Sequence, residues 1–393
     1  MPRRNPSAAV RPWAWWAGGT GLAALGCGIW LGWVELAVPG ASLLAVFLTG
    51  ALASIGNPKL KVELQARHRR VAVGGDPGVS LTVTNLGTRR LTGRQLVVPI
   101  GQGNASIRLA GLAPAASMTA DVTVPTKRRA LLMVGPVQAV RGDPFGMVAR
   151  TWSWGEALAV VVYPATVRVP VSITGLAKDI EGKPTGQPSE ADVSFHALRD
   201  YQPGDDRRAI HWRSTARTGR LMVRQSEDTR RAQLALVVSQ AGREYHQAAD
   251  FELAVSVYAS IGLAQLENSG ELAVIAAGAR LAVNQAGPGP LLDHAAAISL
   301  TSEPGVSHSL AGAAGLTRRE APSATVAVMV TGTVLERREL RRIAWFLPAE
   351  ATALALRCQA GAELSVSQFG RLGLATIGSL EQLPRVLRGL GMQ

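Results

Sequence analysis

The hydrophobic pattern of this chain changes its period near residue 170, and this change restricts the possible architecture more than any other feature. From Leu60 to Val169, short runs such as GVSLTVTNLG and MTADVTVPT alternate apolar and polar residues between Gly, Pro and Asn. Such alternation, with a turn about every 8 to 12 residues, predicts an all-β sandwich. Beyond residue 232, continuous apolar runs such as QLALVVS alternate with helical segments such as Ala248 to Leu266. This second pattern predicts an α/β domain with a parallel sheet covered on both faces.

Two long apolar segments precede the predicted sandwich. Neither Trp13 to Val34 nor Leu36 to Ile55 contains Lys, Arg or Asp, and basic residues flank the pair on both outer sides. Each segment is close to the roughly 20 residues that a helix needs to cross a bilayer. Because basic residues favour the cytoplasmic side, we predict a transmembrane hairpin in the cell membrane with both termini cytoplasmic. The spacing of Gly28 and Gly32 would let the two helices approach closely.

Two alternatives remain for this N-terminal region. The first segment could be a secretory signal, or a lipobox that ends at Cys27, and the hairpin could instead be buried inside a soluble protein. The cysteines Cys27 and Cys358 are far apart in sequence, so neither a disulfide framework nor a cysteine metal site is predicted.

The net charge of the chain is positive, since Lys and Arg number 41 against 28 Asp and Glu. This excess suits an anionic partner, either nucleic acid or the phosphate surface of a membrane. Much of the basic charge flanks the apolar segments, and the chain shows neither interleaved aromatics nor a nucleic-acid-binding motif. We therefore predict the lipid bilayer as a partner, and no nucleic acid.

The most polar segment of the soluble part is the charged run from Phe195 to Arg224, FHALRDYQPGDDRRAIHWRSTARTGRLMVR. Side chains of Asp, Arg and Lys are rarely buried unless paired, so this run predicts either an ion-paired junction or a solvated recognition surface. In the junction, Asp205 or Asp206 would cap a short helix, the arginines would pair with the acids, and Trp212 would anchor two domains. We favour recognition or structure over catalysis. The candidate residues for this role are Tyr201, Pro203, Gly204, Asp205, Asp206, Arg207, Arg208, Trp212, Arg213, Ala216 and Arg217.

Catalytic interpretations of the charged run have less support from residue spacing. A metal site would recruit His196, His211, Asp205 and Asp206, but their spacing matches no known ligand pattern. A nucleophile would be Ser214 or Ser194, and neither lies in a GxSxG turn. The alternative function is an enzyme that acts on a cell-envelope precursor at the inner leaflet, with Asp205 and His211 as acid and base. No catalytic residue and no cofactor is predicted.

The segment RDYQPGDDRRAIHWRSTARTGRLMVRQ resembles the hallmark of an uncharacterised bacterial family, domain of unknown function 58. The upstream segments RRALLMVGPVQAVRGDPFGMV and VVYPATVRV are similar to the same family. The resemblance implies a membrane protein whose C-terminal domain is similar to a von Willebrand factor A domain. It also implies a MoxR-type AAA+ ATPase as partner, with a transglutaminase-like membrane protein as a further one. The expected function is that of a membrane-anchored scaffold, without enzymatic activity, that helps to assemble or activate other complexes.

With the resemblance included, the chain divides into five parts. The expected parts are a transmembrane hairpin (1–58), a β-sandwich (59–169), a linker (170–192), the charged motif region (193–232) and a von Willebrand A-like α/β domain (233–393).

One departure from the von Willebrand A pattern concerns magnesium. The family motif that binds this ion, Asp-x-Ser-x-Ser, follows the first strand and supplies oxygen ligands. Here the strand LALVV is followed by Ser239, so the leading carboxylate is missing and we expect a degenerate site without metal. Titration with calcium or magnesium should leave the melting temperature of the protein unchanged, whereas clear stabilisation at millimolar metal would contradict this prediction.

Overall fold

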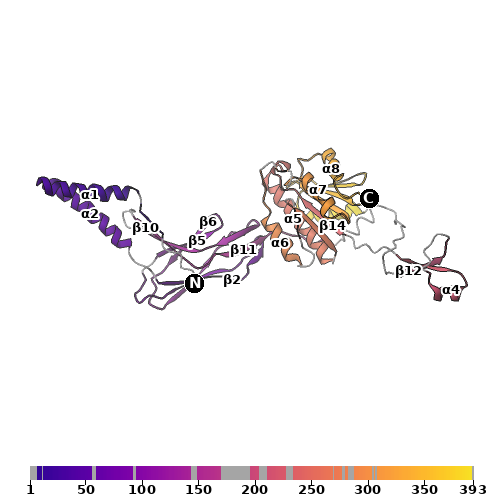
Figure 1. Ribbon diagram of the computed structural model, residues 1–393, viewed down its shortest axis with the longest axis horizontal. Coiled ribbons are helices and arrows are strands. Elements are labelled where there is room, and N and C mark those ends of the chain that lie inside the picture. Colours follow the sequence, from indigo (N-terminus) through magenta and orange to yellow (C-terminus); the bar gives the residue numbers. More distant parts are fainter. Residues whose placement is uncertain are drawn as a thin grey trace. The chain divides into compact units, whose positions relative to one another are not determined.

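The chain forms two compact units, Met1–Ala165 and Thr166–Gln393. The computed structural model describes residues 7–10, 12–54, 59–91, 94–142, 148–169, 195–202, 210–226, 233–268, 270–276, 279–281, 287–302, 305 and 308–391. The predicted linker therefore lies outside the described residues (Figure 1).

The first unit begins with a short strand and a pair of helices and continues as strands. Its elements are β1 (Ser7–Val10), α1 (Pro12–Leu31), α2 (Val34–Ser54), β2 (Leu60–Ala66), β3 (Arg70–Ala72), β4 (Val79–Asn85), β5 (Arg94–Ile100), β6 (Gly103–Leu109), β7 (Ser117–Val122), β8 (Ala130–Val134), β9 (Val137–Gly142), β10 (Val148–Trp154) and β11 (Leu158–Tyr163).

The two helices pack closely along one face, and glycines permit this approach. A Cβ on Gly28 would lie 2.5 Å from the backbone nitrogen of Ala37, and one on Gly40 equally close to that of Leu25. The predicted close approach through Gly28 is thus present, and Gly40 on the other helix permits a second close approach, against Gly21, Ala24 and Leu25. Gly32 has a different role, because its φ of +70° places it in the turn between the helices.

The prediction that this hairpin crosses a membrane is wrong. Within the described residues, no helix combines the length and the apolar character that a membrane span requires. Helix α1 is rich in Trp and Gly, which add little hydropathy, and α2 carries Glu35 in its first turn and Pro39 inside the helix. The expectations of a transmembrane hairpin and of a multi-pass protein in the cell membrane with cytoplasmic termini are overturned together.

The strands of the first unit form two sheets around one core. In the described part, one sheet has the order β1-β10-β9-β5-β8-β11-β3, with β6 also paired to β5, and the other has the order β2-β4-β7. Strand β4 alternates buried and half-buried residues along its length, as a strand does when one face lies on the core. Apolar residues from both sheets, among them Leu81, Leu96 and Val160, share a single hydrophobic cluster.

The second unit contains a small hairpin and a larger α/β sheet. Its elements are β12 (Phe195–Asp200), α4 (Trp212–Thr218), β13 (Met222–Ser226), β14 (Gln233–Val238), η2 (Gly242–Glu244), α5 (Ala248–Glu267), β15 (Glu271–Ala276), β16 (Ala279–Leu281), α6 (Pro288–Ala297), α7 (Leu310–Glu320), β17 (Ala324–Gly332), α8 (Arg337–Ala344), β18 (Thr352–Cys358), β19 (Ser365–Phe369), β20 (Leu372–Ile377), η4 (Leu380–Gln382) and α9 (Leu383–Gly391).

The larger sheet has the order β16-β15-β14-β17-β18-β20-β19. The five inner strands run parallel, and the edge strands β16 and β19 are antiparallel to their neighbours. Taken from β16 to β20, this is the doubly wound order 3-2-1-4-5-6. Such an order places the point where the winding reverses between β14 and β17.

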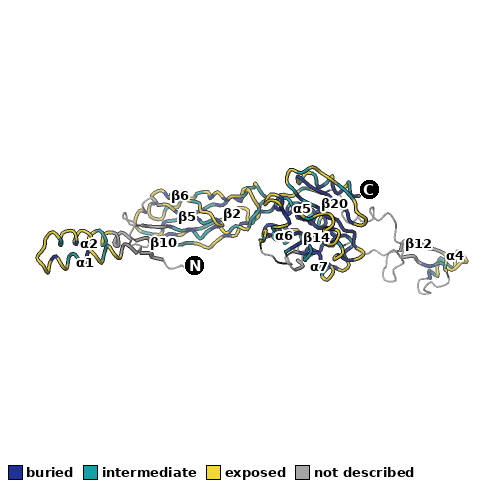
Figure 2. Tube along the Cα trace, turned by 90° about the horizontal axis from the view of Figure 1, so that it is seen from above, coloured by how far each residue is buried: buried dark blue, intermediate teal, exposed yellow. Residues whose placement is uncertain are grey.

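Helices cover both faces of this sheet, which explains why its strands read as continuous apolar runs (Figures 1 and 2). Every residue of β14 is buried. Because side chains alternate across a strand, Leu234 and Leu236 share an apolar cluster with residues of α5 and α9, while Ala235 and Val237 share one with residues of α7 and α8. The two cores therefore share the strands but use alternate residues of each.

Candidate functional site

Part of the charged run folds into a hairpin, which we call the Trp212 hairpin and define as β12, α4 and β13. Strands β12 and β13 pair antiparallel, with Asp200 opposite Met222. The backbone nitrogen of Tyr201 donates to the carbonyl of Leu221 and that of His211 to the carbonyl of Met222, both at 2.8 Å. Ile210 and Val223 are buried and bridge to one another. These contacts are all local, so the hairpin holds its own conformation.

Helix α4 is short and is capped at both ends. His211 occupies the N-cap, where its ring accepts from the backbone nitrogen of Ser214 at 3.3 Å, and its Nδ1 lies 2.7 Å from the Ser214 hydroxyl. Gly219 ends the helix with a φ of +70°, a conformation that favours glycine. His211 and Ser214 thus have a local structural role in starting the helix.

The exposed face of α4 carries most of the predicted motif residues that the structure describes. The side chain of Trp212 is 66% exposed, and Arg213, Ala216 and Arg217 are exposed as well, whereas Tyr201 is half-buried. Of the two readings of the charged run, the exposure of Trp212 and its neighbours favours a recognition surface.

In the described part of the hairpin, Arg220 and Asp200 form a weakly coupled pair of opposite charges. The guanidinium of Arg220 lies 3.9 Å from the carboxylate of Asp200, and both side chains are largely exposed. Exposed pairs of this kind contribute about 0–1 kcal/mol. Arg213 and Arg217 are exposed on α4.

The remaining motif residues lie outside the described residues. These are Pro203, Gly204, Asp205, Asp206, Arg207 and Arg208. Ser194 lies outside them as well. Because Asp205 does too, the distance from Asp205 to His211, on which the acid–base alternative depends, is not described. Among the residues that are described, no three His, Cys, Asp or Glu side chains gather where they could hold a metal ion.

A second candidate site is the carboxyl-terminal edge of the parallel sheet, at the point between β14 and β17 where the winding reverses. Ligands of doubly wound folds bind at this point. In this chain the loop after β14 lies against this edge of the sheet. Within the loop, the hydroxyl of Tyr245 donates to the carbonyl of Ser239 at 2.8 Å. A Cβ on Gly332 would overlap the carbonyl oxygen of Glu244, so loop and strand end are in direct backbone contact. We call residues 239–245 the plug loop.

Glu244 is the charged residue at the centre of this contact. Its carboxylate is buried and accepts hydrogen bonds from the backbone nitrogen of Leu310 and the hydroxyl of Thr331, each at 3.3 Å. Burial raises its pKa above the ordinary value, although the hydrogen bonds from Ser239, Leu310 and Thr331 and the nearby Arg243 oppose that rise.

Glu244 is not among the residues expected from the sequence, where only the missing carboxylate at Ser239 stands out. The signal that could have found it is an acidic residue in the loop directly after the first buried strand. Because the carboxylate is already bonded to N–H and O–H donors of its own chain, its arrangement suits internal bracing. The absence of a metal at this edge stays a prediction.

Asp250 braces the same edge from the start of α5. Its carboxylate accepts from the backbone nitrogen of Ala360 at 2.8 Å and from that of Gln247 at 3.3 Å. The thiol of Cys358, at the end of β18, is buried, and both desolvation and the charge of Asp250 raise its pKa. A raised pKa keeps this cysteine in the unreactive thiol form.

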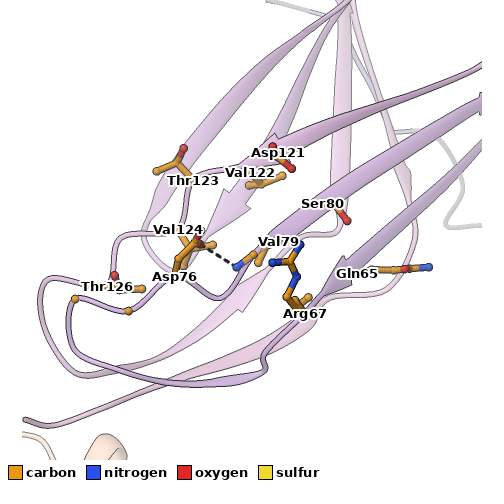
Figure 3. Close-up of a pocket in the computed structure, with 14 residues that line it drawn as sticks. Gln65, Arg67, Asp76, Val79, Ser80, Asp121, Val122, Thr123, Val124 and Thr126 are labelled. Atoms are coloured by element: carbon orange, nitrogen blue, oxygen red, sulfur yellow. Dashed lines mark hydrogen bonds between the residues drawn. The ribbon is translucent and has the colours of Figure 1, made fainter.

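The first unit contains an open cleft of about 650 Å³ between β2, β4 and the segment that follows β7 (Figure 3). Its charged lining residues are Arg67, Asp76 and Asp121. Asp76 is already used in a turn, where it accepts from the backbone nitrogen of Gly78 at 2.9 Å. The described groups form no convergent set of donors or ligands, and we assign no chemistry to this cleft.

Comparison with known proteins identifies one family. Residues 197–383 match the family described as "Protein of unknown function DUF58". This range covers the Trp212 hairpin from residue 197 onward and every strand of the α/β sheet. No curated protein matches the chain.

Proposed function

We propose, from the premise that residues 197–383 belong to the DUF58 family, that this chain is a non-enzymatic interaction protein and that the Trp212 hairpin contacts its partner. One observation carries the proposal: Trp212 is 66% exposed on a short helix that is capped at both ends. Trp and Arg are the residues that most often dominate binding energy at protein interfaces. Held in a self-contained hairpin, they lose little conformational freedom when a partner binds.

The partner in this proposal is a MoxR-type AAA+ ATPase, the class that the resemblance to the family implies. The chain would then act in the assembly or activation of other complexes. The exposed positive charge of Arg213 and Arg217 supports an acidic contact surface on that partner. The described polar groups of the plug loop serve internal hydrogen bonds, so the proposal assigns this loop a structural role and leaves the contact to the hairpin.

A pull-down with the full chain tests the contact. The bait carries Trp212→Ala, Asp205→Ala, Asp206→Ala or Arg207→Ala, and recovery of a MoxR-type ATPase is measured against wild type. We expect Trp212→Ala to reduce affinity about tenfold or more, since truncating a central Trp typically costs at least about 2 kcal/mol. Trp212→Phe, which keeps an aromatic ring, should retain part of the binding.

The matched control is Trp16→Ala, which removes another exposed tryptophan from helix α1. It should recover as much ATPase as wild type. Equal recovery by wild type and all four motif variants would show that the hairpin does not make this contact.

A further inference from the structure

A second surface, on the α/β unit, combines arginines with exposed aromatic rings. We call it the arginine–aromatic patch and define it by Arg318, Arg319, Arg341, Arg342, Trp345 and Phe346. Arg318 and Arg319 end α7, Arg341 and Arg342 end α8, and the two aromatics follow α8 directly. Helices α7 and α8 pack on the same sheet face (Figure 1). The Nη2 atom of Arg318 lies 3.5 Å from the carbonyl of Trp345, which joins the two helix ends into one surface.

The aromatic rings are exposed although the helix beneath them is firmly held. Leu340, Ile343 and Leu347 are buried in the core under α8. Glu336 and Glu339 form a capping box at the start of the helix. Nevertheless Trp345 is 78% and Phe346 51% exposed. A well-anchored segment that presents two large apolar rings to solvent is typical of a binding surface.

Among the described residues of the unit, no carboxylate forms an ion pair with the patch. All four arginines are exposed, and none forms a salt bridge of 4 Å or less with a carboxylate among the described residues. Their position in the last helical turns complements the helix dipoles, a stabilisation of about 0.3–1 kcal/mol each at low salt. The dipole accounts for the arginines but not for the exposure of Trp345 and Phe346.

We infer that the arginine–aromatic patch docks an acidic protein segment that carries apolar side chains, such as an acidic amphipathic helix. Carboxylates would pair with the guanidinium groups, whose planar fork suits bidentate bonding. Apolar side chains would cover Trp345 and Phe346. A single-stranded nucleic acid is favoured less, because it stacks successive bases on aromatics spread along a groove, whereas these two rings lie at one point. This inference does not depend on the role of the Trp212 hairpin.

A binding assay with the full chain tests the inference. The probe is a fluorescein-labelled amphipathic peptide of Glu and Leu, about five helical turns long, and Kd is measured by fluorescence anisotropy at low and moderate salt. We expect Arg341→Glu with Arg342→Glu, and separately Trp345→Ala, to weaken binding about tenfold or more. The control is Arg385→Glu with Arg388→Glu, which reverses two exposed charges on α9 at the other sheet face. It should leave Kd within about twofold of wild type, because distant exposed charges are screened by salt.

Further probes identify the occupant. A peptide with Lys in place of Glu, and one with Ala in place of Leu, should both bind more weakly than the acidic amphipathic peptide. Failure of that peptide to bind, or binding unaffected by the patch variants, would refute the inference. Tighter binding of oligothymidine or of phosphatidylglycerol vesicles through the same residues would also refute it. Trp212→Ala should leave the peptide Kd unchanged, so the two proposals fail or succeed separately.

Discussion

Replacing Gly332 by Ala should destabilise the α/β unit by about 3 kcal/mol or more, one of the largest effects expected of any single methyl group in this chain. The added Cβ would overlap the carbonyl oxygen of Glu244 and lie 2.8 Å from Cδ1 and 2.9 Å from Cα of Tyr245. These atoms belong to the backbone of the plug loop and to a buried ring, which cannot rotate away as an exposed side chain could. Either the loop leaves the strand end or β17 shifts.

The measurement is urea unfolding of the full chain combined with hydrogen exchange of the β14 and β17 amides. The matched control is Gly315→Ala inside α7, where a Cβ meets nothing within 4 Å. Alanine there should stabilise the protein by about 0.5–1 kcal/mol, because it restricts the unfolded chain and has the higher helix propensity. If Gly332→Ala were as stable as wild type, the plug loop would not be in close contact with the end of β17.

The second large effect concerns Glu244. We expect Glu244→Ala to cost about 2–4 kcal/mol, since it opens a cavity and removes the hydrogen-bond acceptor of the Leu310 nitrogen and the Thr331 hydroxyl. Glu244→Gln keeps an acceptor oxygen of similar size. It should therefore stay within about 1 kcal/mol of wild type at neutral pH.

The two proteins should differ in how stability depends on pH. The pKa of Glu244 is raised in the folded state above its ordinary value of 4.5. The folded state therefore binds the proton more tightly than the unfolded state, and the contribution of this group is fully present below pH 4.5. That contribution is lost as the pH rises through the folded-state pKa. The Glu244→Gln protein should not lose stability in this way, because glutamine does not titrate.

Urea unfolding gives the free energy of unfolding of wild type and Glu244→Gln at a series of pH values from 4 to about 7. The difference between the two proteins at each pH reports on Glu244, because all other carboxylates are common to both. Glu381→Gln, in the exposed turn η4, serves as control and should follow wild type. A Glu244→Gln curve parallel to that of wild type would contradict the raised pKa.

The α/β elements were predictable from local pattern. The run QLALVVS became β14, which is buried on both faces, and the segment Ala248 to Leu266 became α5. The basic helix α8 likewise shows a one-sided pattern, with Leu340 and Ile343 as its buried side. In each case the period of apolar residues reflects how many faces of the element are covered, so the pattern carries the information directly.

The N-terminal helices show where such reasoning fails. Both were expected from their apolar composition, and both form, as α1 and α2. The absence of charge predicts a membrane span, but Trp and Gly lower the hydropathy of α1 without adding charge. Freedom from charged residues is a weaker condition than apolar character sustained along a whole helix.

The sequence by itself determined the main strands and helices of the α/β unit, the match of residues 197–383 to a family model and the position of the charged run, because propensity, period and motif are local properties. Only the tertiary structure decided that Glu244 and Gly332 meet at the sheet edge, and that Arg341 and Trp345 share a surface with Arg318. It also decided that Trp212 is exposed. Contact and burial depend on residues far apart in the chain, and no local pattern records which distant residues will cover a side chain.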